Sequence, residues 1–345
     1  MLEIDGSFGE GGGQVLRTSL SLSCLLNKPF RIFNIRIKRK KPGLMPQHLM
    51  GIRALKLISN ARVKGDAKGS TGLIFEPEEV KAGDYLFDIG TAGSTSLLLQ
   101  AIIFPLIFAK SRSSLSLKGG THVPFSPPFH YISEVFIPIL KKLGIRIETK
   151  IESYGFYPKG GGKVMVKITP SGKIKGMSFL ERGEIKKLRG ISGVGNLPLS
   201  IAERQKGAAL KVLASEGLRA EIETLSVLTP GQGTFMFLEA ETDYCLAGFS
   251  SLGERVKRAE LVGEEAAKNF LSYYSTSFCL DHHMADQIVL YLAIAQQESL
   301  FTTSEISNHL LTNLWVIEKF SGASYKVEGE MGKPGKITIY PSISP

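Results

Sequence analysis

Cysteine is scarce in this chain of 345 residues, and the few cysteines are far apart. There are three, Cys24, Cys245 and Cys279, and no two of them form a CxxC pair. Small secreted domains depend on many paired cysteines, and structural zinc sites use closely spaced ones. The sequence therefore predicts neither a disulfide framework nor a structural zinc site, and it favours a reducing compartment, the cytoplasm.

Long hydrophobic runs are also missing. The most apolar stretch, LLLQAIIFPLIFA at residues 97–109, is short for a bilayer and is interrupted by Gln100 and Pro105. The first residues include Glu3 and Asp5, where a secretion signal would be basic and then apolar. We therefore expect a protein without a membrane span or a targeting segment.

Acidic side chains are fewer than basic ones. The chain has 42 Lys and Arg against 32 Asp and Glu, which gives a formal net charge of +10. Such a surplus favours polyanionic partners, nucleic acid or nucleotides, without choosing between them. With 43% hydrophobic residues, a chain of this length can bury a large core and is expected to form more than one domain.

Three segments share one plan, in which a glycine-rich or polar lead is followed by a strongly apolar helix. They begin at Gly9 (GEGGGQVLRTSLSLSCLL), Gly90 (GTAGSTSLLLQAIIFPLIFA) and Asp281 (DHHMADQIVLYLAIAQ). The helices are too apolar for a surface, and β-rich stretches such as FRIFNIRIK and SSLSLKG flank them. The pattern predicts an α+β fold of repeated units with helices packed on sheets.

The pattern of predicted helices and strands changes across residues 184–276. We predict a helix that ends at Gly217, two strands at 220–228 and 233–242 around the turn TPGQG, and a long amphipathic helix at 254–274. Because the third apolar segment follows this region, we expect a smaller domain, 184–276, inserted into a main domain formed by 1–183 and 277–345.

The glycine run GEGGGQ at residues 9–14 opens a helix. Free backbone N–H groups beside the positive end of a helix dipole can hold phosphate oxygens. Glu10 would repel a triphosphate unless a divalent cation lay between them, so Mg²⁺ or Mn²⁺ is expected with it. The alternative is a plain glycine turn with Glu10 in solvent. The Lys-Ser/Thr ending of a Walker A loop is absent.

The densest positive cluster lies in IRIKRKKPG, residues 35–43. Isoleucines alternate with cations here, which predicts a strand that buries Ile35 and Ile37 on one face. Arg39 and the lysines after it are our first choice for contact with nucleic-acid or nucleotide phosphates. The alternative is a solvated edge strand.

Two further segments are rich in groups that can contact a ligand. In DHHMADQ, residues 281–287, His283 and Asp286 are spaced to share a helix face, but the two adjacent histidines should point apart and HExxH spacing is missing. We therefore expect a polar helix start near a ligand and not a zinc site. GGTHVPFSPPFHY, residues 119–131, predicts a stiff apolar loop that could face a nucleobase or simply pack.

His309 lies in an amphipathic helix predicted at 304–322. Ser307 is the expected N-cap, and Leu310, Leu314 and Ile317 form the buried stripe, so the His309 ring should face away from the core. A lone histidine there is usually structural. A helix start nevertheless disfavours the imidazolium and attracts anions, so His309 could also be a neutral nucleophile beside a phosphate.

Taken together, several segments resemble the RNA 3′-terminal phosphate cyclase family, in order, from Leu2 to Ile337. They are DGSFGEGGGQVLRTSLSLS, IRIKRKKPGLMPQHL, DIGTAGSTSLLLQ, GFYPKGGG, HMADQIVL and NHLLTNLWVIEKF. The resemblance implies an ATP-dependent ligase-class enzyme. His309 would attack the α-phosphate of ATP to give a histidine–AMP intermediate. AMP would pass to an RNA 3′-phosphate end, and the 2′-hydroxyl would displace it to close a 2′,3′-cyclic phosphate.

The resemblance also implies roles for single residues. Glu10 matches the glutamate beside the metal, and Arg17, Arg39 and Gln47 match positions that handle phosphate. Positions that match nucleotide contacts are Gln100, Pro127, His283, Met284, Ala285, Asp286 and Gln287. Pro127 matches one side of the slot that holds adenine, and His283 replaces a tyrosine that is common on the other side.

The fold implied by the resemblance has three βαβαββ-type units, similar to the C-terminal domain of a translation initiation factor, with a smaller inserted α/β domain. One alternative function is a non-catalytic, cyclase-like ribosomal RNA processing factor, which would lack the nucleophile. Enolpyruvyl transferases and a passive RNA-binding module are further alternatives. The sequence leaves the oligomeric state, the RNA substrate and the preferred metal open.

Overall fold

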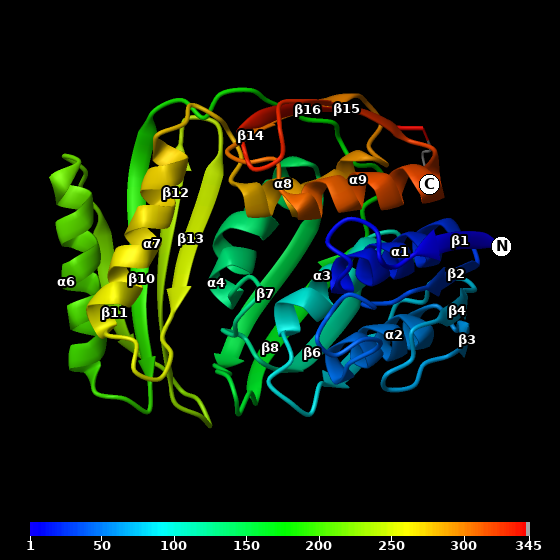
Figure 1. Cartoon of the computed structure of the whole chain (residues 1–345), viewed down its shortest axis with the longest axis horizontal. Coiled ribbons are helices and arrows are strands. Elements are labelled where there is room, and N and C mark those ends of the chain that lie inside the picture. The colour runs from blue at the N-terminus through cyan, green and yellow to red at the C-terminus, as the bar shows by residue number, and fades with distance from the viewer. Residues whose placement is uncertain (343–345) are drawn as a thin grey trace.

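The computed structural model describes residues 1–342 as a mixed α/β structure (Figure 1). Its strands form four four-stranded sheets in the described part of the chain. The last three residues of the predicted main domain, 343–345, lie outside the described residues. Helices and sheets therefore combine as predicted for an α+β class of fold.

The first sheet is built by the N-terminal segment. Its elements are β1 (Leu2–Asp5), α1 (Gly13–Leu26), β2 (Phe30–Phe33), α2 (Pro46–Ile58), β3 (Arg62–Lys64) and β4 (Leu73–Glu76). The sheet order is β1-β2-β4-β3, with β1 and β2 parallel and the other pairs antiparallel. The glycine run precedes α1 and leaves the sheet at the end of β1.

The second sheet follows directly. Its elements are β5 (Asp84–Asp88), α3 (Thr95–Leu106), β6 (Ser113–Gly119), α4 (Phe129–Tyr131), η1 (Ile132–Phe136), α5 (Ile137–Lys142), β7 (Arg146–Ser153) and β8 (Gly162–Thr169). The sheet order is β5-β6-β8-β7, again with a parallel first pair. The proline-rich loop joins β6 to α4.

The third sheet is assembled from two distant parts of the chain. Its elements are β9 (Ser178–Phe179), α8 (His282–Leu292), β14 (Ser299–Thr303), α9 (Asn308–Ser321), β15 (Ser324–Glu328) and β16 (Gly335–Tyr340). Strand β9 pairs in parallel with β14, with Ser178 opposite Leu300 although the two are far apart in the sequence, and the order is β15-β16-β14-β9.

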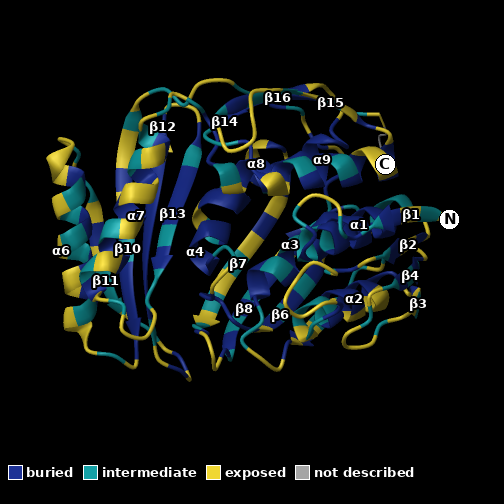
Figure 2. Ribbon diagram, in the orientation of Figure 1, coloured by how far each residue is buried: buried dark blue, intermediate teal, exposed yellow. Residues whose placement is uncertain are grey.

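The intervening residues form a fourth sheet, which we call the β10–β13 unit (residues 185–274). It comprises β10 (Ile185–Gly195), α6 (Leu199–Ser215), β11 (Glu221–Ser226), β12 (Gly233–Thr242), β13 (Leu246–Leu252) and α7 (Ala259–Tyr274). The sheet order is β11-β10-β12-β13, and the unit has a core cluster of its own. Figure 2 shows the outward faces of α6 and α7 exposed, while strands β12 and β13 are largely buried.

The three apolar helices predicted from the sequence are α1, α3 and α8, and each is largely buried. Helix α1 packs against α3 and α9, and α8 packs against α9. Serines of α1 such as Ser21 are buried because this helix is covered on several sides, and Ser21 Oγ donates to the carbonyls of Arg17 and Ala101. This packing gathers the starts of α1, α8 and α9 from distant parts of the sequence.

The strand predicted at residues 35–38 is wrong. Strand β2 ends at Phe33, and Asn34 and Arg36 take left-handed backbone conformations with φ of 55° and 53°. Arg36 Nη1 donates to the carbonyl oxygens of Lys41 and Gly43 at 2.9 and 2.8 Å, which holds the segment as a folded loop. Ile35 is buried, but Ile37 is 47% exposed, because a turn does not keep the two-residue alternation of a strand.

The expectation that the cysteines would stay unpaired is also wrong for two of them. Cys245 and Cys279 form a disulfide with their Cα atoms 6.1 Å apart, and Cys24 is a free, buried thiol. Sequence spacing gave no signal, because the two residues lie 34 positions apart and meet only through the return of the chain from α7 to α8. Within residues 1–342, no helix combines the length and the apolar character needed to cross a membrane.

Candidate functional site

The start of α9 presents His309 to solvent beside the glycine run. Ser307 is the N-cap, as predicted, and its Oγ accepts from the backbone N–H of Leu310 at 2.9 Å. Leu310, Leu314 and Ile317 are buried, so the opposite face of the first turn is outward and the His309 side chain is 50% exposed. The predicted orientation of this histidine is confirmed.

The glycine run packs directly against this helix. Gly9 has a φ of +59°, and a Cβ atom there would collide with Oγ1 of Thr312 on α9. At the first residue of α1, a Cβ on Gly13 would lie 2.7 Å from Nε2 of His48 and 2.9 Å from Nη1 of Arg17. Glycine is required at Gly9, where the backbone is left-handed and Thr312 occupies the space, whereas a side chain at Gly13 would displace the ends of Arg17 and His48.

Glu10 lies between His309 and the basic loop. Its Oε1 is 4.0 Å from Nδ1 of His309, and its Oε2 pairs with Arg39, whose Nη2 also donates to the Glu10 carbonyl at 2.9 Å. Only 12% of the Glu10 side chain is exposed. The alternative of Glu10 in open solvent is therefore wrong, since the carboxylate is held against the site.

Several charges act on the His309 imidazole. Its pKa lies below the ordinary value of 6.5, chiefly because of burial, and the cationic Arg17 and Arg39 lower it further while Glu10 opposes them. The neutral form is therefore favoured at neutral pH. A neutral imidazole has a lone pair on one ring nitrogen and can act as a nucleophile.

Arg17 and His48 lie next to Gly13, at the end of the glycine run. Arg17 Nη2 donates to Oε1 of Gln14 at 2.5 Å, and burial lowers the pKa of Arg17 to about 10, which leaves it cationic at neutral pH. Burial and the charges of Arg17 and Arg36 lower the pKa of His48 to about 3, and its Nδ1 accepts from the backbone N–H of Met45 at 3.1 Å. His48 was not predicted as part of the site.

Asn313 joins the three helices of the site and was also missed from the sequence. Its Oδ1 accepts from Thr18 Oγ1 at 2.7 Å and from Gln14 Nε2 at 3.0 Å, both on α1. Its Nδ2 donates to the carbonyl of Asp286 on α8 at 2.6 Å. The available signal was a polar residue inside the apolar stripe of α9, which is 2% exposed in the structure.

Asp286 on α8 contacts the N-cap residue of α9. Ser307 Oγ donates to Oδ1 of Asp286, and Asp286 is buried. Burial raises the pKa of Asp286 well above its ordinary value, and the Ser307 hydrogen bond opposes this shift. The structure places this predicted residue at the His309 turn, where it holds the cap in position.

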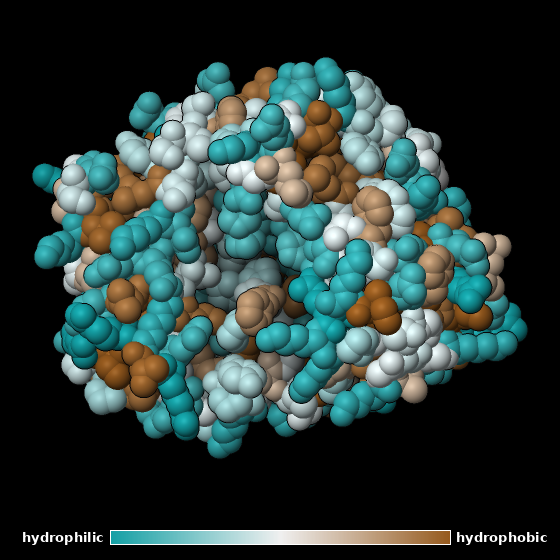
Figure 3. Space-filling model, in the orientation of Figure 1, coloured by the Kyte–Doolittle hydropathy of each residue, from teal (hydrophilic) through white to brown (hydrophobic). Residues whose placement is uncertain are grey.

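Gln100 and Gln287 meet across α3 and α8. Gln100 Nε2 donates to Oε1 of Gln287, and both line a small cavity of about 30 Å³ between the helices. The other residues lining this cavity include Arg17, Asp286 and Asn313. Figure 3 shows a hollow near the middle of this face of the molecule, with both polar and apolar side chains at its rim.

His283 is exposed at the start of α8. Its ring centroid is 3.9 Å from that of His282, so the prediction that these adjacent histidines point apart is wrong. His283 is exposed, whereas Asp286, three residues later on α8, is buried. The His283 ring meets Tyr131 edge to face with 6.1 Å between centroids, and Pro127 lies four residues before Tyr131 on the loop that leads into α4.

The three remaining predicted contacts are Met284, Ala285 and Gln47. Met284 and Ala285, in the first turns of α8, are fully buried. Gln47 is half-buried in the first turn of α2, where its Cβ approaches Gly93. Their contacts with a nucleotide stay predictions.

Glu10 offers one carboxylate oxygen that a hard cation could use. No group of three or more His, Cys, Asp or Glu within residues 1–342 is arranged to hold a metal. Oε1 of Glu10 nevertheless faces His309, while Arg39 occupies Oε2. Mg²⁺ and Mn²⁺ take oxygen ligands and retain water or phosphate oxygens, so Glu10 Oε1 could be the protein's contribution to such a site.

The chain is similar to a well-defined group of proteins. A family model described as RNA 3'-terminal phosphate cyclase matches residues 8–327. Proteins named RNA 3'-terminal phosphate cyclase from Pyrococcus abyssi and Pyrobaculum neutrophilum are each 44% identical to it, over 98% and 95% of both chains. The protein of that name from Thermococcus kodakarensis is 45% identical over 99% of both chains.

Proposed function

The chain belongs to the RNA 3′-terminal phosphate cyclase family, and on that premise we propose that it is an ATP-dependent enzyme that converts an RNA 3′-terminal phosphate to a 2′,3′-cyclic phosphate. The observation that carries this proposal is His309, half exposed at the N-terminal turn of α9, with Glu10 4.0 Å away and the glycine run packed beside it. A passive RNA-binding protein would need no such nucleophile.

In the first step, Nδ1 of His309 faces Glu10 and leaves Nε2 as the attacking nitrogen. The Nε2–phosphorus bond forms at the α-phosphate of ATP while the bond to the β-phosphate oxygen breaks, releasing pyrophosphate. Glu10 orients the imidazole and favours the tautomer with hydrogen on Nδ1. The cation predicted beside Glu10 would neutralise phosphate charge when bound.

In the later steps, an oxygen of the RNA 3′-phosphate attacks the AMP phosphorus, and the bond to Nε2 breaks. The neighbouring 2′-hydroxyl then attacks the 3′-phosphorus, and AMP leaves. Arg17 and Arg39 would hold phosphate oxygens through these transfers, because cations stabilise the charge that spreads over phosphate oxygens. Gln47 is proposed as a further phosphate contact.

The adenosine of ATP is proposed to lie along α8. Gln100 and Gln287 offer amide groups at the small cavity, and Asp286 holds the cap beneath His309. His283 and Pro127 are proposed to lie on either side of the adenine. An imidazole has less stacking area than a phenol, so this slot contributes less to base binding than a tyrosine would.

We also propose a domain organisation for this chain. The first three sheets share one order of elements, strand-helix-strand-helix-strand-strand, which supports three βαβαββ units in a main domain at 1–183 and 277–345. The separate sheet and core of the β10–β13 unit support an inserted domain at 184–276. A cytoplasmic location stays a prediction, and the Cys245–Cys279 bond weakens its basis in cysteine usage.

Incubation of the purified protein with ATP tests the proposal. Release of pyrophosphate and a mass increase of one AMP on the peptide that contains His309 are expected. An RNA with a 3′-phosphate should then acquire a 2′,3′-cyclic end. A folded protein that binds RNA but never acquires AMP would instead be the non-catalytic processing factor.

Replacement of Glu10 by alanine is expected to raise the divalent metal concentration needed for AMP labelling, by roughly tenfold or more. The reason is that Glu10 Oε1 is the carboxylate oxygen nearest His309. The measurement is the labelling rate as a function of Mg²⁺ and of Mn²⁺. Glu3→Ala is the matched control, since the Glu3 side chain is exposed and pairs with the exposed Arg31. An unchanged titration in Glu10→Ala would remove Glu10 from the site.

The labelling rate should be level at neutral and higher pH and fall in acid, with a midpoint below 6.5, because the pKa of His309 is lowered and only neutral imidazole attacks. Arg39→Met should move this midpoint to higher pH, since it removes a cation and frees Glu10 to stabilise the imidazolium. Single-turnover labelling from pH 4.5 to 8 measures it. Arg31→Met should leave the midpoint in place, and a lower midpoint in Arg39→Met would contradict the assignment.

A further inference from the structure

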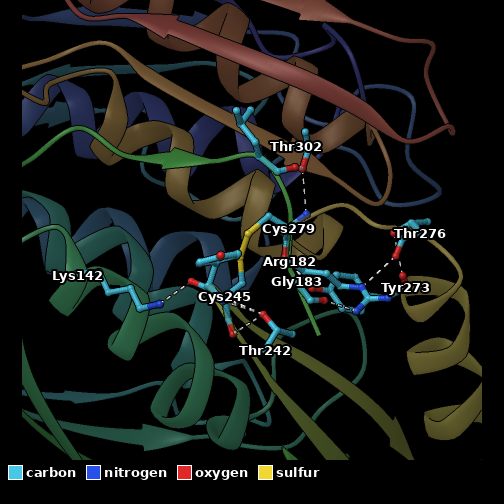
Figure 4. The surroundings of a disulfide bond; sticks show 11 residues. Lys142, Arg182, Gly183, Thr242, Cys245, Tyr273, Thr276, Cys279 and Thr302 are labelled. Atoms are coloured by element: carbon cyan, nitrogen blue, oxygen red, sulfur yellow. Dashed lines mark hydrogen bonds between the residues drawn. A yellow bond between two sulfur atoms is a disulfide. The ribbon is translucent and has the colours of Figure 1, made fainter. Parts of the chain in front are cut away.

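The disulfide joins the β10–β13 unit to the segment that leads into the candidate site (Figure 4). Cys245 lies in the turn between β12 and β13, and Cys279 lies in the return segment between α7 and α8. Both are buried, at 2% and 0% exposure. A thiol in solution therefore reaches the bond only when this junction opens locally.

Two chain segments connect the β10–β13 unit to the rest and meet at this junction. The outgoing segment runs from β9 to β10, and the return segment runs from α7 to α8. Arg182, in the outgoing segment, donates through Nε to the carbonyl of Thr276 and through Nη2 to that of Tyr274, each at 3.0 Å. Its guanidinium carbon also lies 5.1 Å from the centre of the Tyr274 ring. These contacts tie the segment that contains Arg182 to the return segment, but they do not reach β13.

A further non-covalent contact reaches the turn between β12 and β13 from the main body. Lys142 of α5 donates through Nζ to the carbonyl of Tyr244 at 2.7 Å. The β10–β13 unit also has its own core cluster. This hydrogen bond and this core remain when the disulfide is absent. The disulfide can therefore be reduced without unfolding the chain.

The junction is linked directly to the start of α8. Cys279 lies two residues before Asp281, the N-cap of α8, whose Oδ1 accepts from the backbone N–H of Met284 at 3.0 Å and from the Tyr131 hydroxyl at 2.8 Å. Oδ2 of Asp281 accepts from the backbone N–H of Gly248 on β13 at 3.4 Å. The disulfide and this carboxylate are thus two successive links between β13 and the first turn of α8.

We propose that Cys245 and Cys279 form a reversible redox latch that couples the β10–β13 unit to nucleotide binding on α8. The proposal rests on the proposed function of α8, whose first turns carry His283 and Asp286. The oxidised latch fixes the start of α8 in its binding position. The reduced latch lets β13 and the return segment separate, and the nucleotide then has to restore their order at a cost in affinity.

The reduction step balances with a dithiol as the reductant. The Cys245–Cys279 sulfur–sulfur bond and the two S–H bonds of the dithiol break. Two cysteine S–H bonds and one disulfide within the former dithiol form. Two electrons and two protons pass from the dithiol to the cysteines, and the oxidised dithiol reverses the exchange.

The experiment compares the oxidised full-length protein with the same protein reduced by dithiothreitol. Intact mass and thiol alkylation report the state of the bond. Reduction is expected to weaken ATP binding about fivefold, a typical size for coupling between two sites. It should also speed amide hydrogen exchange in residues 279–286 and 245–250. Cys245→Ala and Cys279→Ser should have the ATP affinity and exchange rates of the reduced protein, and dithiothreitol should not change them.

Cys24→Ala is the matched control, because Cys24 is equally buried but unpaired. It should keep the full response to dithiothreitol. Equal ATP affinity in the two redox states overturns the proposal, and so does a failure of the bond to form under oxidising conditions. If neither state binds ATP, the proposed function fails on its own. The exchange rates still decide the latch in that case, since faster exchange on reduction supports it and unchanged exchange overturns it.

Discussion

His309→Ala is expected to abolish AMP labelling by ATP, with a loss of at least roughly 10⁴-fold, the scale seen when a covalent nucleophile is removed. The reason is that His309 supplies the proposed nucleophilic nitrogen at the turn where Glu10 and the glycine run meet. The measurement is transfer of radiolabelled AMP to the protein, followed by peptide mapping.

The fold should survive this substitution, since the His309 side chain is 50% exposed. Circular dichroism and thermal unfolding check this expectation. Asn308→Ala is the matched control, because Asn308 is exposed in the same helical turn and outside the proposed machinery. AMP labelling at the normal rate in folded His309→Ala would refute the mechanism.

Asn313→Ala is expected to lower the free energy of unfolding by about 3 kcal/mol. The substitution removes three hydrogen bonds at a site that is 2% exposed, and it leaves buried polar groups on α1 and α8 without their partner. Labelling by ATP should fall as well, because Asn313 fixes the relative positions of the three helices that carry the site.

Urea unfolding followed by tryptophan fluorescence measures this effect. Trp315, the only tryptophan in the chain, lies on α9 and stacks on Phe8 with 4.0 Å between ring centroids, so its emission reports on this region. Asn269→Ala is the control for an exposed asparagine and should stay within about 0.5 kcal/mol of the parent. A similarly small change in Asn313→Ala would show that the Asn313 contacts are not structural.

Local patterns predicted much of the helical framework. The N-cap Ser307 and the apolar spacing of Leu310, Leu314 and Ile317 correctly predicted how the His309 helix begins and which face it buries. The strands β11 and β12 also fall within their predicted ranges. These predictions succeeded because capping and side-chain periodicity act over a few residues and can be read from neighbouring letters.

The errors arose where backbone conformation or distant contacts decide the outcome. Alternation at residues 35–38 suggested a strand, but the left-handed Arg36 and its hydrogen bonds to Lys41 and Gly43 make a loop. The amphipathic helix predicted from residue 254 begins at Ala259. Adjacent His282 and His283 were expected to diverge, yet their rings come together at the exposed end of α8.

The sequence by itself determined the apolar helices, the glycine run, the caps and the surplus of positive charge, since each of these depends on residue type and short spacing. Only the tertiary structure decided that Glu10 and His309 approach to 4.0 Å, that Asn313 joins α1 to α8, and that Cys245 reaches Cys279. Those pairs are distant in the chain, and their distances follow from how the helices and sheets pack, which no local pattern encodes.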